Sequence, residues 1–369
     1  MQRTRTARRW TRDVSVWALL MVGAVIVGLV THGHAQEAKD VLEADGAREE
    51  VAPPMSVESA TTAPRHDIVP GTGPDAVVPP IKRTAPIVAA KTLFGAQQKP
   101  APLVARSIGF YSKGCLAGGV QLPVNGPAWQ AMRLSRNRNW GHPALIATIE
   151  RFAVEARTLD GWAGLLVGDI SQPRGGPMLT GHASHQIGLD ADIWFTPMPG
   201  RELTRQERED MSAVSMLAPG HLAVDPKVWT PQHVSLIKRA AGYADVERVL
   251  VHPAIKKALC EGAAPAPDRA WLGKVRPVWG HFYHFHIRLG CPKGLTGCQP
   301  QPPTGADDGC GKELDEWYLR MTAPPKPAGP PAPPEPPKPP LTLEQLPTEC
   351  RVVLAAETAA PVTKPAKVK

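Results

Sequence analysis

The chain has 369 residues, a formal net charge of +8 and 42 prolines. Five arginines and one aspartate in the first 13 residues supply +4 of this charge, so the remainder is only mildly basic. That balance excludes the dense basic stripe of a nucleic-acid-binding protein, so no nucleic-acid partner is expected, but it suits contact with an anionic polymer.

The first 35 residues have the layout of a cleavable signal peptide. Arginines precede an uncharged apolar run from Val14 to Val30, and Gly33-His34-Ala35 forms a small-x-small cleavage site. The alternative is an uncleaved anchor, because the run is at the short limit for a membrane-spanning helix. In both cases the domain leaves the cytoplasm. We expect a periplasmic protein that touches the membrane only if this segment stays attached.

Proline crowds into residues 52–102 and 323–347, where too little apolar surface is available to offset chain entropy. We therefore predict a disordered Pro/Ala-rich linker over residues 36–102, a single domain over 103–320 and a Pro-rich tail over 321–369. The six cysteines of an exported chain predict disulfides, and their pairing stays open at this point. The absence of a Cys-x-x-Cys pair argues against a structural zinc knuckle.

Apolar periodicity predicts the main elements of the domain. Helices are expected over residues 143–159, 232–241 and 253–260; strands over 164–168, 189–195, 246–251 and 284–289; and a loop over 174–177. Mixed helices and short strands in this order indicate an α+β fold, a single compact domain with a small, mainly antiparallel sheet.

Five of the twelve histidines fall within residues 181–192 and 281–286. On a strand over 284–289, His284 and His286 point to the same face. Asp192 lies on the strand over 189–195, and Gly188 lets the chain turn after His185. Two imidazoles and one carboxylate leave a fourth position open for water, which is the pattern of catalytic zinc. Both stretches lack soft ligands, which argues against copper and iron–sulfur chemistry.

Other readings of the motifs have less support. The sequence has neither His-Glu-x-x-His nor Gly-x-Ser-x-Gly, so a helical zinc motif and a serine hydrolase are not indicated. The isolated histidines are interpreted as surface or satisfied core residues: His32, His34, His66, His142, His233 and His252.

At these residues the chain resembles the penicillin-insensitive murein endopeptidases, which belong with lysostaphin, the D-Ala-D-Ala peptidases and hedgehog-like domains. The shared pattern is His185, Gly188, Asp192 and the distant His284 and His286, with Ser184 just ahead. The resemblance extends from Arg106 to Trp317. Further matching segments are 107–109, 113–115, 141–143, 181–186, 274–277 and 308–311, with a late Cys350.

The resemblance implies a hedgehog/DD-peptidase-like domain whose zinc ligands are His185, Asp192 and His286. His284 would be the general base or transition-state stabiliser, with His281 assisting.

The resemblance also implies additional metal contacts at His182 and His221. The family has an aspartate three residues before the second of these, where this chain has Ala218, which counts against a second metal site. The implied disulfides are Cys115–Cys350, Cys260–Cys310 and Cys291–Cys298. The first of these would tie the Pro-rich tail back to the domain.

The implied reaction is hydrolysis of the D-alanyl–meso-diaminopimelate amide that cross-links peptide stems in peptidoglycan, carried out by a zinc-activated water. No serine acyl-enzyme forms, which explains insensitivity to penicillin. One alternative is a D,D-carboxypeptidase on the same scaffold, for which Arg174 is a candidate to bind the free carboxylate. The other is a non-catalytic zinc-containing module that binds peptidoglycan; the presence of His284 and His281 beside the ligands favours catalysis.

Overall fold

The computed structural model describes residues 88–263, 269–324 and 339–357. All of them belong to the second of the two units into which the chain divides, Asp45–Lys369. The predicted signal peptide and most of the predicted linker lie outside the described residues. Within the described part, no helix combines the length and the apolar character needed to cross a membrane.

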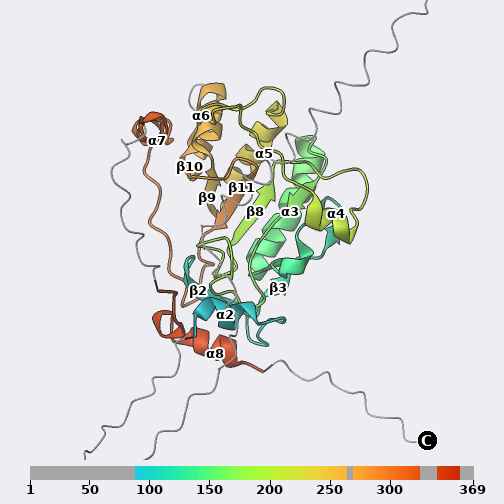
Figure 1. The fold of residues 1–369 in the computed structure, drawn as a ribbon, viewed down its shortest axis with the longest axis vertical. Coiled ribbons are helices and arrows are strands. Elements are labelled where there is room, and N and C mark those ends of the chain that lie inside the picture. Colours follow the sequence, from blue (N-terminus) through green and yellow to red (C-terminus); the bar gives the residue numbers. More distant parts are fainter. Residues whose placement is uncertain (1–87, 264–268, 325–338, 358–369) are drawn as a thin grey trace, which may run out of the picture. The chain divides into compact units, whose positions relative to one another are not determined.

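A seven-stranded mixed sheet forms the centre of the domain (Figure 1). Its order is β10 (Val275–Pro277), β9 (Val246–Val251), β11 (His284–Leu289), β8 (Asp190–Trp194), β7 (Leu165–Val167), β5 (Trp129–Ala131) and β4 (Asn125–Gly126). The β10–β9 and β7–β5 pairs are parallel and the other four pairs are antiparallel. The predicted α+β class and the mainly antiparallel sheet are confirmed.

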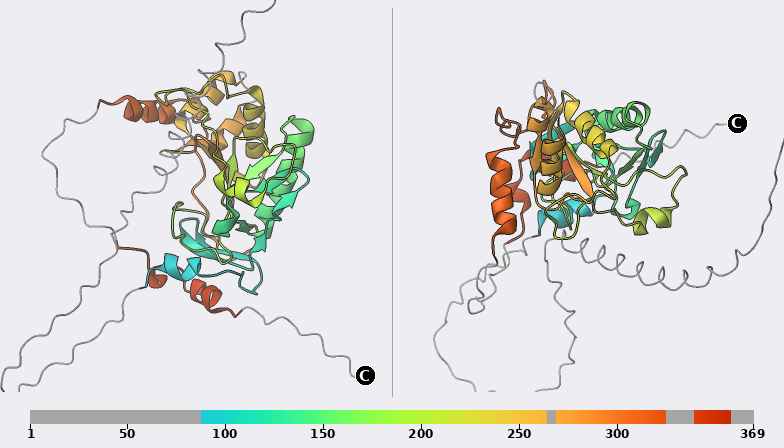
Figure 2. Two further views of the ribbon diagram at one scale, coloured as in Figure 1. Left: turned by 45° about the vertical axis from the view of Figure 1, so that its right-hand side comes forward. Right: turned by 90° about the horizontal axis from the view of Figure 1, so that it is seen from above.

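Helices cover the apolar side of the central strands. The helices α3 (Pro143–Leu159) and α5 (Pro231–Gly242) lie beside β8, β9 and β11, and α6 (Pro253–Gly262) packs on β10 (Figures 1 and 2). Phe152 of α3 contacts Phe285 of β11 edge to face, with ring centroids 6.3 Å apart. Because side chains alternate along a strand, the residues on either side of Phe285 are directed to the opposite face. That face carries the histidines.

Two helices begin with the same device, a histidine followed by proline. The Nδ1 atoms of His142 and His252 accept hydrogen bonds from the backbone N–H groups of Ala144 and Ala254, at 3.2 and 3.1 Å. Proline at the first helical position adds no unsatisfied donor. His233 similarly accepts from the Thr230 N–H at the start of α5. All three are buried, as expected for core histidines, but Nε2 of His142 has no hydrogen-bond partner among the described residues.

A separate apolar layer is built from the two ends of the described chain. It contains α2 (Ala90–Gly95), the hairpin β1 (Arg106–Phe110) and β2 (Lys113–Ala117), the short helix η3 (Leu343–Gln345) and α8 (Glu349–Ala355). In Figure 1, α2 and α8 lie side by side, and the Ala90 N–H donates to the Leu341 carbonyl at 2.8 Å. The predicted linker over 36–102 and tail over 321–369 therefore each contain ordered structure. Amino-acid composition did not predict this ordered structure, because a few apolar residues such as the fully buried Phe94 are enough to pack a short helix against the domain.

Three disulfides link the described residues: Cys115–Cys350, Cys260–Cys310 and Cys291–Cys298. These are the pairings that the resemblance implied. Smaller elements complete the described structure, namely β3 (Val120–Gln121) paired with β6 (Trp140–Gly141), the 3-10 helices η1 (Leu134–Arg136) and η2 (Ala270–Lys274), α4 (Arg205–Asp210) and α7 (Lys312–Thr322).

Candidate metal centre

The pairing of β8 with β11 brings the two sequence stretches together. His286 lies directly opposite Asp192 in the antiparallel register. The Asp192 Oδ1 atom lies 3.3 Å from His286 Nδ1 and 3.4 Å from His185 Nε2. All three side chains are buried. The three residues expected to be zinc ligands therefore converge on one carboxylate oxygen.

The loop before β8 directs the His185 ring into this group. His185 has a φ of +65°, a left-handed conformation that costs on the order of 1–3 kcal/mol in a residue other than glycine. Its Nδ1–H donates to the Ile170 carbonyl at 2.7 Å, so Nε2 is the ring nitrogen that faces Asp192. Gly188, at φ +71°, turns the chain where an added Cβ would lie 2.9 Å from the His142 nitrogen. The turn expected at Gly188 thus has a steric basis.

Asp190 orients both histidine ligands and was not anticipated from the sequence. Its Oδ1 lies 2.9 Å from His286 Nε2, and its Oδ2 accepts the backbone N–H of His185 at 2.9 Å. Arg288 completes the arrangement by donating Nε–H to Asp190 Oδ1 at 2.7 Å. Asp190 pairs with Nε2 of His286 and leaves Nδ1 facing Asp192. A carboxylate on the outer ring nitrogen is an arrangement usual for metal-bound histidine.

The charges around Asp190 decide its protonation. Burial acts to raise its pKa, but the charges of His286 and Arg288 outweigh burial and hold the pKa below the ordinary value. Asp190 therefore remains a carboxylate. The alternation Asp190, Asp192 on one strand and His286, Arg288 on the other is the pattern from which this pairing could have been predicted.

Two polar atoms at the centre are buried without a hydrogen-bond partner among the described residues, His185 Nε2 and Asp192 Oδ1. Leaving such atoms unsatisfied costs about 1–3 kcal/mol each. A cation between them would supply the missing partner. Imidazole nitrogens with a carboxylate oxygen, and no thiolate, form a donor set that suits zinc. The residues present therefore fit the expected metal.

His284 and His281 border the same group. His284 Nε2 lies 3.7 Å from Asp192 Oδ1, and its ring centroid lies 4.8 Å from that of His281. Burial lowers the pKa of His284 to about 3, so its imidazole is neutral near pH 7. His281 has a φ of +55°, and its Nδ1 lies 2.8 Å from the Trp279 carbonyl oxygen.

The two histidines that the resemblance implied as additional metal contacts, His182 and His221, lie in different places. His182 Nε2 lies 3.5 Å from Asp192 Oδ2, and ligand atoms of His182, His185 and Asp192 all lie within 4.8 Å of one another. His221 is exposed and packs against Phe282, with ring centroids 5.8 Å apart. The structure thus brings His182 into the group and leaves His221 outside it.

Comparison with known proteins agrees with this geometry. Residues 107–355 match the family model described as penicillin-insensitive murein endopeptidase. The chain belongs to this family. Among its relatives is the penicillin-insensitive murein endopeptidase of Haemophilus influenzae, 45% identical over 230 residues, which are 60% of this chain and 75% of the relative. That of Klebsiella pneumoniae subsp. pneumoniae is 40% identical over 250 residues, 68% of this chain and 86% of the relative.

The contacts of Arg174 do not leave it available to bind a substrate carboxylate. Its side chain is buried, and its guanidinium donates to the carbonyls of Val353 and Leu354 at the end of α8, at 2.9 and 2.6 Å. It also donates to the Lys99 carbonyl. Arg174 therefore joins the terminal layer to the domain, and sequence could not reveal this because its partners lie far away along the chain.

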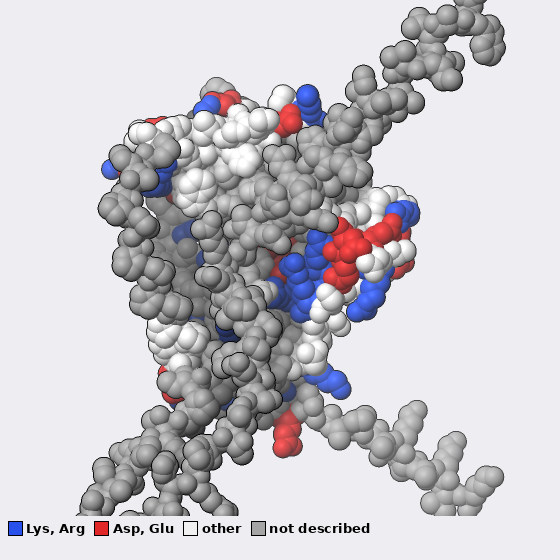
Figure 3. All heavy atoms as spheres, in the orientation of Figure 1, with Lys and Arg blue, Asp and Glu red and all other residues white. Residues whose placement is uncertain are grey.

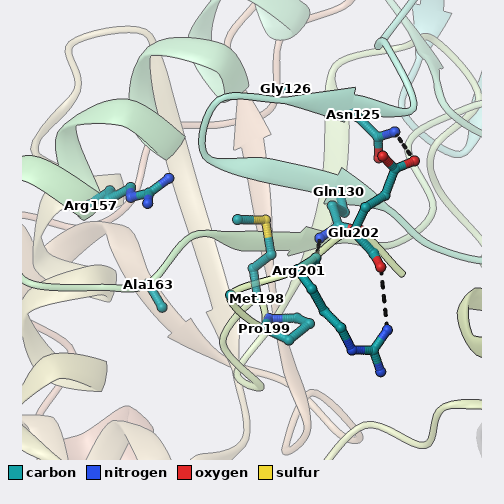
Figure 4. Close-up of a pocket in the computed structure, with 10 residues that line it drawn as sticks. Asn125, Gly126, Gln130, Arg157, Ala163, Met198, Pro199, Arg201 and Glu202 are labelled. Atoms are coloured by element: carbon teal, nitrogen blue, oxygen red, sulfur yellow. Dashed lines mark hydrogen bonds between the residues drawn. The ribbon is translucent and has the colours of Figure 1, made fainter. Parts of the chain in front are cut away.

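Two other surface features lie apart from the metal group. Acidic and basic side chains are mixed over the region of α4 (Figure 3). A cavity of about 250 Å³ lies between β4 and the loop at 198–202 (Figure 4). Met198 and Arg201 line it, but no histidine or aspartate of the metal group does.

Proposed function

We propose that this chain is a zinc endopeptidase that hydrolyses the D-alanyl–meso-diaminopimelate amide between peptide stems of peptidoglycan. The observation that carries the proposal is the convergence of His185 Nε2, His286 Nδ1 and the Asp192 carboxylate in a buried position, where His185 Nε2 and Asp192 Oδ1 have no hydrogen-bond partner among the described residues. Three such ligands leave one position open for water, as in catalytic rather than structural zinc sites.

The roles follow from the contacts of each side chain. His185, Asp192 and His286 would hold the metal, with Asp190 fixing the tautomer of His286. Bound zinc lowers the pKa of its water and polarises the substrate carbonyl. His284, neutral and beside Asp192, would accept a proton from the attacking water, and His281 would assist it. His182 is placed to contact the metal or to orient Asp192.

The alternatives have less support. Arg174 is engaged with backbone carbonyls, so the cation suggested for a carboxypeptidase is not available. A purely structural zinc site would not require His284, whose Nδ1 is buried without a partner among the described residues. What distinguishes His284 from His142, whose Nε2 is also buried without a partner among the described residues, is its place beside Asp192 in the metal group.

The setting of the enzyme follows from the same features. The predicted signal peptide and three disulfides support a periplasmic location, where cysteines are oxidised. In the proposed reaction no serine is acylated, so a β-lactam would find no nucleophile to modify.

The test uses the exported chain and purified cross-linked muropeptide dimers. The expected result is conversion of dimers to monomers, loss of this activity on chelation, recovery on adding zinc, and no effect of penicillin. Release of free D-alanine from pentapeptides with dimers left intact would instead establish the carboxypeptidase. Binding of peptidoglycan without either product would establish the non-catalytic module.

A further inference from the structure

A strained loop borders the metal group between β5 and β6. Arg133 and Asn137 both have left-handed backbones, with φ of +53° and +51°, on either side of η1. Several hydrogen bonds hold this conformation. Arg133 donates to the Met211 carbonyl at 2.8 Å, and the N–H and hydroxyl of Ser135 both donate to Glu209 at 2.8 Å. Strain that the surroundings maintain in this way is a feature of functional sites.

The loop delivers Arg136 to the edge of the metal group. The buried Asp169 Oδ2 atom is contacted by Arg136 Nη1 at 3.1 Å and by His182 Nε2 at the same distance. The Arg136 guanidinium and the His182 ring therefore contact the same oxygen atom of Asp169, and His182 also contacts Asp192. Neither Asp169 nor Arg136 was anticipated from the sequence, because their contact joins segments 33 residues apart.

Arg136 differs from the second arginine at this carboxylate. Arg138 contacts Asp169 Oδ2 at 2.8 Å, is 8% exposed, and uses its other terminal nitrogen to donate to the Thr180 carbonyl. The Arg136 side chain is 46% exposed, and among the described residues it makes its hydrogen bond to Asp169 alone. Two guanidinium groups on one carboxylate leave a net positive charge. Within the described part of the chain, the remaining donors of the Arg136 guanidinium have no partner, and the side chain is half exposed.

The substrate of the proposed function has an anion in the corresponding place. The nitrogen of the scissile amide belongs to the D-centre of meso-diaminopimelate, and the carbon next to it carries a free carboxylate. When the scissile carbonyl lies at the metal group, that carboxylate lies at its rim. A guanidinium matches a carboxylate with two parallel hydrogen bonds.

We propose that Arg136 binds the carboxylate adjacent to the scissile nitrogen and so selects cross-links formed at that centre. Asp169 holds Arg136 in place and neutralises Arg138. This assignment rests on the proposed function. It adds the residue that recognises the part of the substrate that carries the scissile nitrogen.

The test compares two dimers that differ only in this carboxylate, free in one and amidated in the other. The wild-type enzyme should have a kcat/KM about 10- to 100-fold higher for the free acid, the range of a charge-assisted hydrogen bond. Arg136→Gln should lose that factor on the free acid, change little on the amide, and keep its zinc content and melting temperature. Arg136→Lys should recover part of the loss, since it restores charge without the planar donors.

Arg201→Gln is the matched control, because Arg201 is also an exposed arginine paired with a carboxylate, Glu207, but lines the cavity away from the metal group. It should leave both rates unchanged. Equal loss on both dimers in Arg136→Gln and Arg136→Lys, or a wild-type enzyme indifferent to amidation, would overturn the assignment of Arg136. A wild-type enzyme that cuts neither dimer would overturn the proposed function and the assignment with it.

Discussion

Two regions of the molecule join segments that are distant in the chain, and they do so with different kinds of contact. One is the strand pair β8 and β11; the other is the terminal layer formed by α2, β1, β2 and α8. In the strands, the contacts that face the metal group are buried and ionic, such as Asp190 with His286 and Arg288. In the terminal layer, Phe94, Ile108 and Val353 form an apolar cluster around the Cys115–Cys350 disulfide.

Buried ion pairs add little net stability, because desolvation offsets their attraction, but they define positions closely. Apolar burial and a disulfide stabilise a fold without requiring any reactive group. We therefore expect changes in the strands to affect chemistry first, and changes in the terminal layer to affect stability first.

The largest expected effect separates catalysis from metal binding within the strands. His284→Ala should keep its zinc and its fold, because His185, Asp192 and His286 remain, while dimer cleavage falls by about 10²–10⁴-fold. His281→Ala should have a smaller effect in the same direction. Elemental analysis and rates of monomer formation measure the two properties. Loss of zinc from His284→Ala would make this residue a ligand and contradict the division of roles.

An intermediate effect is expected in the terminal layer. Replacing both Cys115 and Cys350 by alanine should lower the free energy of unfolding by about 2–5 kcal/mol, since the bond closes a long loop. Denaturant titration measures this loss. Dimer cleavage at low temperature and zinc content should remain near those of the wild-type protein. A variant that is as stable as the wild type but inactive would reverse the proposed contrast between the regions.

The smallest effect is expected from shortening the chain before α2. Removing residues 36–87 should change neither melting temperature nor activity, because this stretch has no core-forming pattern in its sequence. Extending the deletion to residue 100 removes the fully buried Phe94, and stability should fall by roughly 3–5 kcal/mol. Equal melting temperatures for the two truncations would show that α2 does not contribute to the layer.

The same contrast explains what could be predicted from the sequence. The helix Pro143–Leu159 and the strands Val246–Val251 and His284–Leu289 have the expected bounds, because their periodicity is contained within each segment. In the terminal layer the resemblance implied the Cys115–Cys350 bond, but the helices α2 and α8 were not predicted because their apolar residues are few and lie beside Pro-rich sequence. In Figures 1 and 2 the two ends of this layer meet although they are far apart in the chain.

For the site, the histidine and aspartate types limited the chemistry before any geometry was known. The supporting groups were harder to predict, although the strand alternation that places Asp190 on the face of Asp192 is visible in the sequence. Asp190, Asp169 and Arg136 are ordinary charged residues until the register of β8 with β11 and the loop after β5 give them partners. Arg174 is the opposite case. In the sequence it looks like a cation available to substrate, but its guanidinium donates to backbone carbonyls that lie 179 and 180 residues away along the chain.

The disulfide between Cys115 and Cys350 spans 235 residues, and this separation has a consequence for biogenesis. A chain that emerges in order from its first residue presents the hairpin and α2 long before α8 exists. Their apolar surfaces must wait, exposed, until residues 341–355 have been made and delivered to the same compartment. A chain interrupted before α8 would lack the apolar residues that cover α2 and the hairpin, and Cys115 would have no disulfide partner at position 350.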